Sequence, residues 1–240
     1  MIKFVLELKE KIQVAADVYD FLFTPNKKLI FKPGQYLGLI LGNGDQDGKD
    51  RRRYFSIASS PTEADIRIGI KFHFKPNSLT QSMLSLKSGH KLEVSQLAGD
   101  FVLSKNKNKK LVFIAGGIGV TPFRSMIKYL LDTKGKRDII LLYSNYKPAD
   151  ILYKDIFDKA EERLGIKTIY TVTDVPYPED WRGERGFIDE KMIKRAVPDY
   201  KERIFYLSGS NSMVVAFEEI LQKMGVKKRQ IKKDFFPGLV

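Results

Sequence analysis

Two patterns of hydrophobic and polar residues divide the chain near its middle. Up to about residue 103, short runs alternate between apolar and polar positions, and turn-forming Gly, Asn, Asp and Pro residues separate the runs. From residue 111 onward, fully apolar runs alternate with stretches in which apolar residues recur every three or four positions. The first half therefore predicts an antiparallel sandwich or barrel, and the second half predicts a parallel sheet with helices on both faces.

The first pattern predicts strands and one helix. The strands are expected at residues 2–9, 19–25, 35–42, 54–59, 66–74 and 91–97. Ser78 is the expected N-cap of the helix, the apolar residues after it share one helical face, and Gly89 is expected to end it.

The second pattern predicts strands and helices in alternation. The strands are expected at residues 111–117, 138–145, 167–174 and 203–210. The helices are expected at residues 121–135, 151–165, 189–197 and 212–225.

The stretch SKNKNKK, at residues 104–110, contains no apolar side chain. It predicts a linker between a domain at 1–104 and a domain at 110–240, because the pattern changes after it. The alternative is a long hairpin loop within one domain.

Composition removes several classes of site. The chain of 240 residues has no cysteine, which excludes disulfides, thiolate zinc sites and iron–sulfur clusters. Its two histidines, His73 and His90, are far apart, so no metal site is expected. No signal sequence and no apolar run of about 20 residues is evident, so we expect a cytoplasmic protein without a membrane span.

The formal charge of +13 favours an anionic partner. Nucleic acid, a phosphorylated small molecule and an acidic protein all satisfy this condition. The lysines are spread along the chain rather than gathered in a basic arm, so charge alone does not distinguish these partners.

The stretch AGGIGVTPF, at 115–123, follows an apolar strand and opens a helix. Gly116, Gly117 and Gly119 would let the backbone approach a phosphate, and a helix N-terminus supplies N–H donors. Thr121 adds a hydroxyl group, and Pro122 suits the first helical turn. The alternative is a glycine turn needed only for tight packing between strand and helix.

The stretch LSGSNSMV, at 207–214, repeats this arrangement with Ser208 and Gly209 at the end of a later strand. On its own it is equally consistent with a capped helix start. Two such strand ends in one parallel sheet favour a shared ligand crevice. Ser144, Asn145 and Thr173, at the ends of two other strands of the set, join the candidate binding residues.

The stretch RRRYFSIASSP, at 51–61, places arginines directly before aromatic and hydroxyl residues. The Arg53 guanidinium would suit a diphosphate, Phe55 offers a face to a flat ring, and Ser56 offers a hydroxyl to the edge of that ring. Arg51 and Arg52 are expected to stay solvated. The alternative is an edge strand with arginines on its solvent face.

In this order, RYFSIASSP, AGGIGVTPFRSM and YLSGSNSMV resemble the ferredoxin–NADP⁺ reductase superfamily. Arg53, Tyr54, Phe55 and Ser56 match the flavin motif Arg-x-Tyr/Phe-Ser of that family. AGGIGVTP contains its phosphate motif Gly-Gly-x-Gly-x-Thr-Pro, and LSGS departs from its Cys/Ser-Gly-Pro segment only by Ser210. WRGERGFID and KKDFFPGLV also resemble family segments, and the similarity covers nearly the whole chain.

The resemblance implies an N-terminal FAD-binding antiparallel barrel and a C-terminal NAD(P)-binding α/β domain. It assigns contacts with the ribityl or adenosine part of the flavin to Ile70, Lys71 and Phe72. It assigns the pyrophosphate, together with Arg53, to Ser78, Leu79 and Thr80. A pyrophosphate site favours FAD, although an FMN protein would keep much of this sequence.

By the same resemblance, hydride passes from NADPH or NADH to flavin N5, and electrons then pass to a separate acceptor. Ser56 would hydrogen-bond the N5/O4 edge, while Thr121 and Ser208 would position the nicotinamide; Ser56 and Ser208 are the candidate catalytic residues. Phe55 would pack on one face of the flavin and Phe236 would cover the other.

The acceptor and the coenzyme stay open at this stage. Without cysteines the chain cannot hold the fused [2Fe–2S] domain of many relatives, and its basic charge suits an acidic ferredoxin or flavodoxin. The alternatives are a flavin-bearing subunit of an oxygenase and, more remotely, a nucleic-acid-binding protein. Lys147 lies where a 2′-phosphate would be met, but a solvated lysine is an equal explanation.

Overall fold

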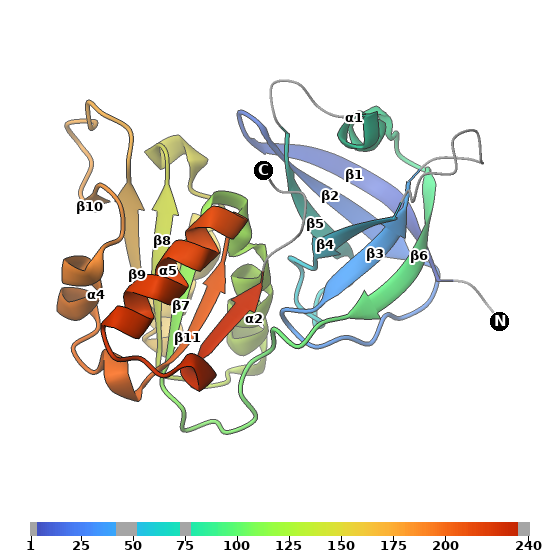
Figure 1. The fold of residues 1–240 in the computed structure, drawn as a ribbon. Coiled ribbons are helices and arrows are strands. Elements are labelled where there is room, and N and C mark those ends of the chain that lie inside the picture. Colours follow the sequence, from blue (N-terminus) through green and yellow to red (C-terminus); the bar gives the residue numbers. More distant parts are fainter. Residues whose placement is uncertain (1–3, 42–51, 73–77, 235–240) are drawn as a thin grey trace.

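The computed structural model describes residues 4–41, 52–72 and 78–234, with the backbone alone described at 78–81. Within these residues two six-stranded sheets lie side by side (Figure 1). The first sheet has the strand order β4-β3-β6-β1-β2-β5, and the second has the order β10-β9-β8-β7-β11-β12.

All strand pairs of the first sheet are antiparallel. Its strands are β1 (Val5–Ala15), β2 (Val18–Pro25), β3 (Tyr36–Ile40), β4 (Arg52–Ser56), β5 (Ile66–Lys71) and β6 (Lys91–Ala98). Just beyond β4, the Ala58 N–H donates to the Arg67 carbonyl of β5 at 2.8 Å, which joins the two edges of the sheet. The sheet therefore curls into a barrel, one of the two arrangements that the alternating pattern allowed and the one that the family resemblance implied.

Alternation along β5 separates the inside of the barrel from the side that faces the second sheet. Ile66, Ile68 and Ile70 are buried in the barrel core, as successive strand residues point to opposite faces. Gly69 and Lys71 point the other way, and both lie near residues of the second sheet. Strand β5 therefore contributes both to the barrel core and to the boundary between the sheets.

The predicted helix is α1 (Ser78–Ser85), which begins at Ser78 and ends earlier than expected. The prediction that Gly89 ends the helix is wrong. Leu86 and His90 instead form turn hydrogen bonds to the carbonyls of Met83 and Lys87. Gly89, at φ +86°, lies in the turn that leads into β6, which needs a left-handed residue there.

All strand pairs of the second sheet are parallel. Its strands are β7 (Leu111–Gly116), β8 (Ile139–Asn145), β9 (Lys167–Val172), β10 (Glu184–Arg185), β11 (Ile204–Ser208) and β12 (Ile231–Asp234). Its helices are α2 (Thr121–Thr133), α3 (Lys154–Leu164), α4 (Glu190–Ala196) and α5 (Asn211–Lys223). Short 3₁₀ turns occur at Gly117–Val120, Pro148–Asp150, Tyr200–Glu202 and Lys228–Gln230.

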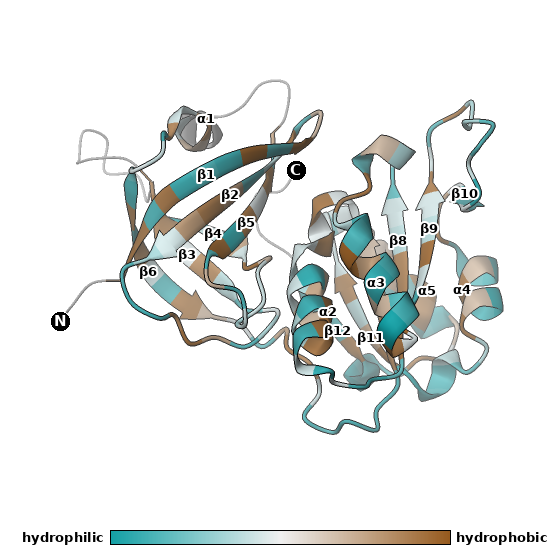
Figure 2. Ribbon diagram, turned by 180° about the vertical axis from the view of Figure 1, so that it is seen from behind, coloured by the Kyte–Doolittle hydropathy of each residue, from teal (hydrophilic) through white to brown (hydrophobic). Residues whose placement is uncertain are grey.

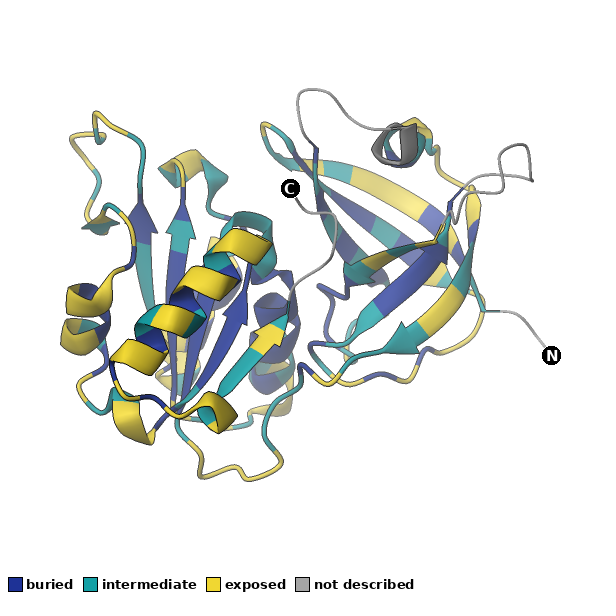
Figure 3. Ribbon diagram, in the orientation of Figure 1, coloured by how far each residue is buried: buried dark blue, intermediate teal, exposed yellow. Residues whose placement is uncertain are grey.

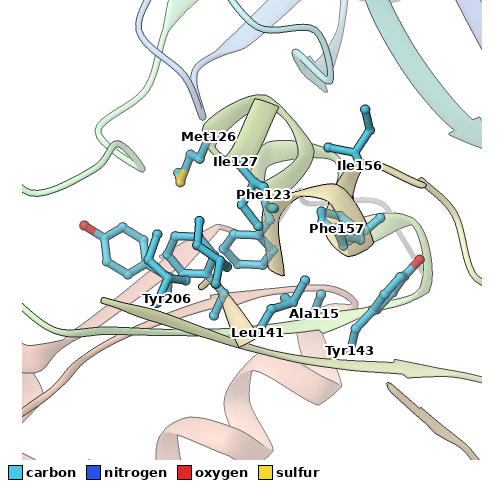
Figure 4. Close-up of a cluster of buried hydrophobic side chains, with 14 of the residues drawn as sticks. Ala115, Phe123, Met126, Ile127, Leu141, Tyr143, Ile156, Phe157 and Tyr206 are labelled. Carbon is cyan, nitrogen blue, oxygen red and sulfur yellow. The ribbon is translucent and has the colours of Figure 1, made fainter. Parts of the chain in front are cut away.

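Helices α2 and α3 cover one face of the second sheet, and α4 and α5 cover the other (Figures 1 and 2). Toward α2, the rings of Phe113 and Phe123 stack with centroids 4.5 Å apart, and Tyr206 packs edge-on against Phe113 (Figure 4 draws this cluster). The central strands are buried on both faces (Figure 3), as their unbroken apolar runs predicted. No helix in the described ranges is long and apolar enough to cross a membrane.

Strand order reverses between β7 and β11, because β8 lies on one side of β7 and β11 lies on the other. Such a reversal opens a crevice at the carboxyl ends of the two strands, where ligands of α/β sheets bind. The two glycine-containing stretches, 115–123 and 207–214, meet at this crevice.

Residues 104–110 connect β6 to β7 without helix or strand. Arg137 donates to the carbonyls of Ser104 and Asn106, so this segment is tied to the second sheet. The exact division of the chain into domains at this segment stays a prediction.

Candidate functional site

The glycine loop after β7 packs directly on the end of β11. A Cβ atom added at Gly119 would lie 2.5 Å from the Ser208 carbonyl oxygen. Added at Gly116 or Gly209, it would lie 2.2 or 2.7 Å from Sδ of Met213 on α5. Close packing against backbone therefore accounts for the absence of a side chain at Gly119, as the alternative interpretation of the loop proposed, whereas at Gly116 and Gly209 the neighbour is the flexible end of Met213.

Gly117 differs from its neighbours in the loop. Its φ is +49°, a left-handed conformation, and a Cβ atom added there would meet nothing within 4 Å. Its backbone faces open space at the start of the 3₁₀ turn that leads into α2. The left-handed conformation favours glycine here, and the open space leaves its backbone accessible to a ligand.

A cavity of about 250 Å³ lies between the two sheets beside Gly117. Five of the residues predicted from the sequence line it: Lys71, Gly117, Ser144, Asn145 and Thr173. The first sheet contributes the lysine and the second sheet contributes the rest, so the cavity opens where both halves of the chain meet.

Asn145 lines this cavity, and the polar atoms of its side chain are buried. The residue is only 5% exposed, and neither its amide oxygen nor its amide nitrogen has a hydrogen-bond partner of normal geometry among the described residues. Burying a hydrogen-bond donor or acceptor costs free energy unless it has a hydrogen-bond partner. Nearby, the Thr173 N–H donates to the Asn145 backbone carbonyl at 3.1 Å and holds the two strand ends together. Ser144, Asn145 and Thr173 together give this side of the cavity a polar lining.

Two aromatic residues that the sequence did not single out also line the cavity. Tyr146 is 59% exposed and Phe187 is 81% exposed. Large exposed rings at a cavity mouth offer flat faces for a heterocyclic base. Tyr146 directly follows YSN and Phe187 lies within WRGERGFID, so their closeness to sequence motifs was the signal that could have identified them.

Ser56 lies at the end of β4, where the first sheet meets the last strand of the second. Its hydroxyl donates to Oδ2 of Asp234 at 3.1 Å, across 178 positions of sequence. Asp234 is also the parallel neighbour of Ser208 in the pairing of β12 with β11. Asp234 is thus next to both predicted catalytic serines, hydrogen-bonded to Ser56 and paired with Ser208 in the sheet.

Asp234 was missed by the sequence analysis, which examined KKDFFPGLV for its aromatic residues. Burial raises the pKa of Asp234 to about 6, against a smaller opposing effect of the hydrogen bond from Ser56. Asp234 also borders a second cavity, of about 430 Å³, which Tyr36, Phe101 and Lys232 help to line. A carboxylate with a perturbed pKa in a cavity between two sheets is typical of a functional site.

The rest of the flavin motif lies on β4. An Arg53 Nη donates to the neighbouring Arg52 carbonyl at 2.7 Å. Phe55 is half-buried against the barrel core, whereas Tyr54 is 39% exposed and packs edge-on against Tyr36 with ring centroids 5.5 Å apart. The flavin roles predicted for these residues stay predictions.

The residues predicted on β5 differ in direction. Ile70 and Phe72 are both 7% exposed and belong to the barrel core, so only their backbone is available to a cofactor. Lys71 lines the first cavity.

The remaining predicted residues lie near helix starts or outside the description. Thr121 and Pro122 are buried in the first turn of α2, and the Thr121 hydroxyl donates to the Ile118 carbonyl at 3.1 Å. Ser78, Leu79 and Thr80 form the first turn of α1, but their side chains, like Phe236, His73 and Arg51, lie outside the described residues.

Comparison with known proteins agrees with this geometry. The model of the oxidoreductase NAD-binding domain family matches residues 113–219. NADH-cytochrome b5 reductase 1 of Ajellomyces capsulatus is 30% identical over 236 residues, which cover 92% of this chain and 74% of that protein. The glycine betaine monooxygenase reductase subunit of Pseudomonas aeruginosa is 28% identical over 230 residues, which cover 94% of this chain and 62% of that subunit.

The fold matches a solved structure along its whole length. The flavohem-like FAD/NAD-binding domain of nitric oxide dioxygenase from Vibrio cholerae superposes with a TM-score of 0.84 at 20% identity, covering 98% of this chain and 99% of that one. At this identity the likeness concerns the fold alone.

A curled antiparallel sheet, joined to a parallel sheet with a ligand crevice at its switch point, is the fold of the two-part FAD- and NAD-binding domain compared above. The chain belongs to the ferredoxin–NADP⁺ reductase superfamily, whose members are flavin-dependent NAD(P)H oxidoreductases. The resemblance and the fold class predicted from the sequence are confirmed. The chain spans only 62% of the length of the monooxygenase reductase subunit it matches.

Proposed function

We propose that this chain is an FAD-dependent reductase that takes a hydride from a nicotinamide coenzyme and passes electrons to a separate acceptor. The observation that carries the proposal is the meeting of Ser56, Asp234 and Ser208 where the two sheets join. Bound FAD would supply the redox chemistry, since it accepts a hydride and releases electrons to a second partner. The protein supplies binding, orientation and exclusion of water.

The second sheet holds the coenzyme in this proposal. The accessible backbone at Gly117 and the start of α2 bind the pyrophosphate of the nicotinamide coenzyme through N–H groups. Asn145 contributes to the cavity wall beside the ligand, and the rings of Tyr146 and Phe187 flank the base. Ser208, which is 2% exposed at the end of β11, orients the nicotinamide end.

The first sheet presents a polar edge to the flavin ring. Because the single hydroxyl hydrogen of Ser56 is donated to Asp234, its oxygen has only lone pairs to offer to a further group. In this orientation it can accept from the N–H that N5 carries only in the reduced flavin, whereas toward the acceptor N5/O4 edge of the oxidised flavin the Ser56 hydrogen would turn away from Asp234 to the ring. Asp234 holds the hydroxyl in that orientation while it is ionised.

Cofactor identity is tested by binding. The flavin-free protein is titrated separately with FAD and with FMN, and the dissociation constant of each is measured by fluorescence quenching. A site that uses the pyrophosphate binds FAD at least about tenfold more tightly. Equal affinity for the two flavins contradicts the pyrophosphate assignment to Arg53 and the start of α1.

The cavity of about 250 Å³ beside Gly117 is the coenzyme cavity of this proposal, and its charges suit NADH better than NADPH. Lys147, the candidate partner of a 2′-phosphate, lies 3.5 Å from a carboxylate oxygen of Asp174, and Lys71 lies 3.3 Å from one of Asp17. Asp150 adds another carboxylate to the cavity lining. A doubly charged phosphate would face these carboxylates across already paired lysines.

The coenzyme preference is measured by the ratio of kcat/KM for NADH and for NADPH with a small-molecule acceptor such as ferricyanide. We expect the ratio to favour NADH by at least about tenfold. The relative from Ajellomyces capsulatus is named NADH-cytochrome b5 reductase 1, which supports this expectation. A preference for NADPH contradicts the electrostatic argument.

The acceptor proposed is an acidic electron-transfer protein, of the ferredoxin or flavodoxin type or an oxygenase component. The formal charge of +13 supports such a partner, and one relative is the reductase subunit of a monooxygenase. Reduction of an acidic [2Fe–2S] ferredoxin should slow steeply as salt is raised, because steering by charge is screened. A rate independent of salt contradicts charge-guided docking.

A further inference from the structure

A buried polar contact joins the two sheets at the end of the coenzyme cavity. Asp20, on β2 of the barrel, is completely buried. Its carboxylate accepts hydrogen bonds from the Tyr153 hydroxyl at 2.6 Å and from the Arg67 guanidinium at 2.5 Å. Tyr153 belongs to the α/β half of the chain, directly before α3. One carboxylate of the barrel is therefore held from both halves of the chain.

Tyr153 reaches the barrel from a strained backbone. Its φ of +56° lies in the left-handed region, which bulky residues rarely adopt. The Tyr153 carbonyl accepts from the N–H groups of Ile156 and Phe157 at the start of α3, so the helix fixes this conformation. Strain of this kind persists where the surrounding structure requires it, and it is concentrated at functional positions.

Gly69, on β5, lets the two sheets approach each other at the same place. A Cβ atom added at Gly69 would lie 2.9 Å from the Tyr153 hydroxyl oxygen and 2.9 Å from Cγ2 of Thr121. It would also lie 3.1 Å from Cδ1 of Ile118. Ile118 and Thr121 belong to the glycine loop that carries the coenzyme in the proposed function, so the contact reaches the coenzyme site directly.

A second polar bridge supports the first. The buried Arg124 of α2 donates to both carboxylate oxygens of Glu63, at 2.8 and 2.9 Å, and to the Ala58 carbonyl at 2.7 Å. Its guanidinium carbon lies 5.1 Å from the centroid of the Tyr153 ring. Strand β4 carries the flavin motif, and Ala58 and Glu63 lie in the loop that follows it. Arg124 thus links this loop to Tyr153, the residue that binds Asp20.

Stability alone does not explain this arrangement. Removing charges from water is costly, and well-packed apolar residues often stabilise a buried interface as much as an ion network does. Directional hydrogen bonds add a defined distance and angle between the two bodies that they join. Residues next to the contact, Val18 near Asp20, Leu152 beside Tyr153 and Lys71 after Gly69, line the coenzyme cavity.

We propose that Tyr153 is a positioning residue, which through Asp20 and Gly69 sets the separation between the flavin carried by the barrel and the nicotinamide carried by the glycine loop. This inference rests on the proposed function. Hydride transfer requires the reacting atoms at about 3–3.5 Å, and a displacement of about 1 Å can cost about a hundredfold in rate. Tyr153 is not among the residues that line either cavity, so its effect would reach the reaction through the relative placement of the sheets.

The test compares Tyr153→Phe with Tyr170→Phe in the FAD-loaded protein. Tyr170 is a matched control, because its hydroxyl donates to Asp158 at 3.1 Å, a bond within the α/β half. For Tyr153→Phe we expect a limiting rate of flavin reduction by NADH about tenfold below wild type, with NADH affinity changed less than about twofold. The primary isotope effect with 4-deuterated NADH should rise, and Tyr170→Phe should leave rate and isotope effect unchanged.

A purely structural tyrosine gives a different result. Tyr153→Phe would then lower the amount of bound flavin, while the rate per bound flavin and the isotope effect stayed at wild-type values, and the inference would be overturned. If the wild-type flavin is not reduced by NADH or NADPH at all, the proposed function itself fails. Wild-type reduction together with an unaltered Tyr153→Phe rate overturns the positioning role alone.

A second variant tests the geometry independently. Gly69→Ala places a methyl group against the Tyr153 hydroxyl and the Thr121 methyl group, so it should slow flavin reduction. In a Tyr153→Phe background one of these contacts is gone, and the fold-effect of Gly69→Ala should be smaller. If the double variant slows flavin reduction by the product of the two single effects, Gly69 and Tyr153 are not coupled, and a shared contact is contradicted.

Discussion

Replacing Asp234 with asparagine should stabilise the protein at alkaline pH and leave it nearly unchanged at acid pH. Burial raises the pKa of this carboxyl from 3.8 to about 6, so the folded state disfavours the charged form. An asparagine has nearly the same shape, carries no charge, and can still accept the hydrogen bond that Ser56 donates.

The magnitude follows from the shift of about two pKa units. Each unit corresponds to about 1.4 kcal/mol, so ionised Asp234 costs the folded state about 3 kcal/mol at pH 8. Since the folded pKa is above the unfolded one, this cost is absent below about pH 4 and develops as the pH rises through about 6. Asp234→Asn should therefore gain up to about 3 kcal/mol at pH 8 and less than about 1 kcal/mol at pH 4.

Urea unfolding of flavin-free wild type and variant at pH 4 and pH 8 measures the two differences. Ser56→Ala is the companion variant. It removes the hydrogen bond that lowers the pKa of Asp234, so the stability of this variant should fall more steeply with pH than that of wild type. The assignment of a buried carboxyl with a raised pKa would be refuted if Asp234→Asn were less stable than wild type at pH 8, or if it gained equally at both pH values.

The two kinds of glycine in the loop after β7 should respond differently to alanine. Gly119→Ala, whose Cβ atom would lie 2.5 Å from the Ser208 carbonyl oxygen, should lose about 2–3 kcal/mol in urea unfolding, whereas Gly117→Ala should lose about 1 kcal/mol and mainly weaken NADH binding. Equal losses of stability would contradict the distinction between packing and ligand approach. Ser208→Ala should keep its FAD but reduce it more slowly in single-turnover mixing with NADH, and a wild-type rate would remove Ser208 from the mechanism.

Local patterns predicted most of the fold. The unbroken apolar run of β7 predicted a strand buried on both faces. The helix predicted at 212–225 is α5, which begins one residue earlier, at Asn211, with Ser210 as its N-cap. Strand β12 was not predicted, because IKKD carries three charges and becomes a strand only by pairing with β11. Strand β10, of two residues, has no pattern long enough to recognise.

The candidate site was predictable where its chemistry lies in one segment. Gly117, Asn145 and Ser208 end strands of a parallel sheet, and their convergence follows from that topology. Asp234 was not predictable, because its raised pKa comes from burial and its partner, Ser56, lies 178 positions away. Tyr153 was equally hidden, since its left-handed backbone and its bond to Asp20 exist only in the assembled pair of sheets.

The net charge, in contrast, carried little information about function. A charge of +13 allowed a nucleic-acid-binding protein as readily as a reductase. The ordered motifs and the fold placed the chain in its family, and the charge then bears only on the choice of acceptor.

Hydride transfer from the crevice at β7 and β11 to a flavin at β4 is most directly tested by anaerobic mixing of the FAD-loaded protein with one equivalent of NADH. The account predicts loss of the oxidised-flavin absorbance in proportion to the NADH added, with a primary isotope effect when C4 carries deuterium. An FAD-loaded protein whose flavin stays oxidised in excess NADH and in excess NADPH would contradict it.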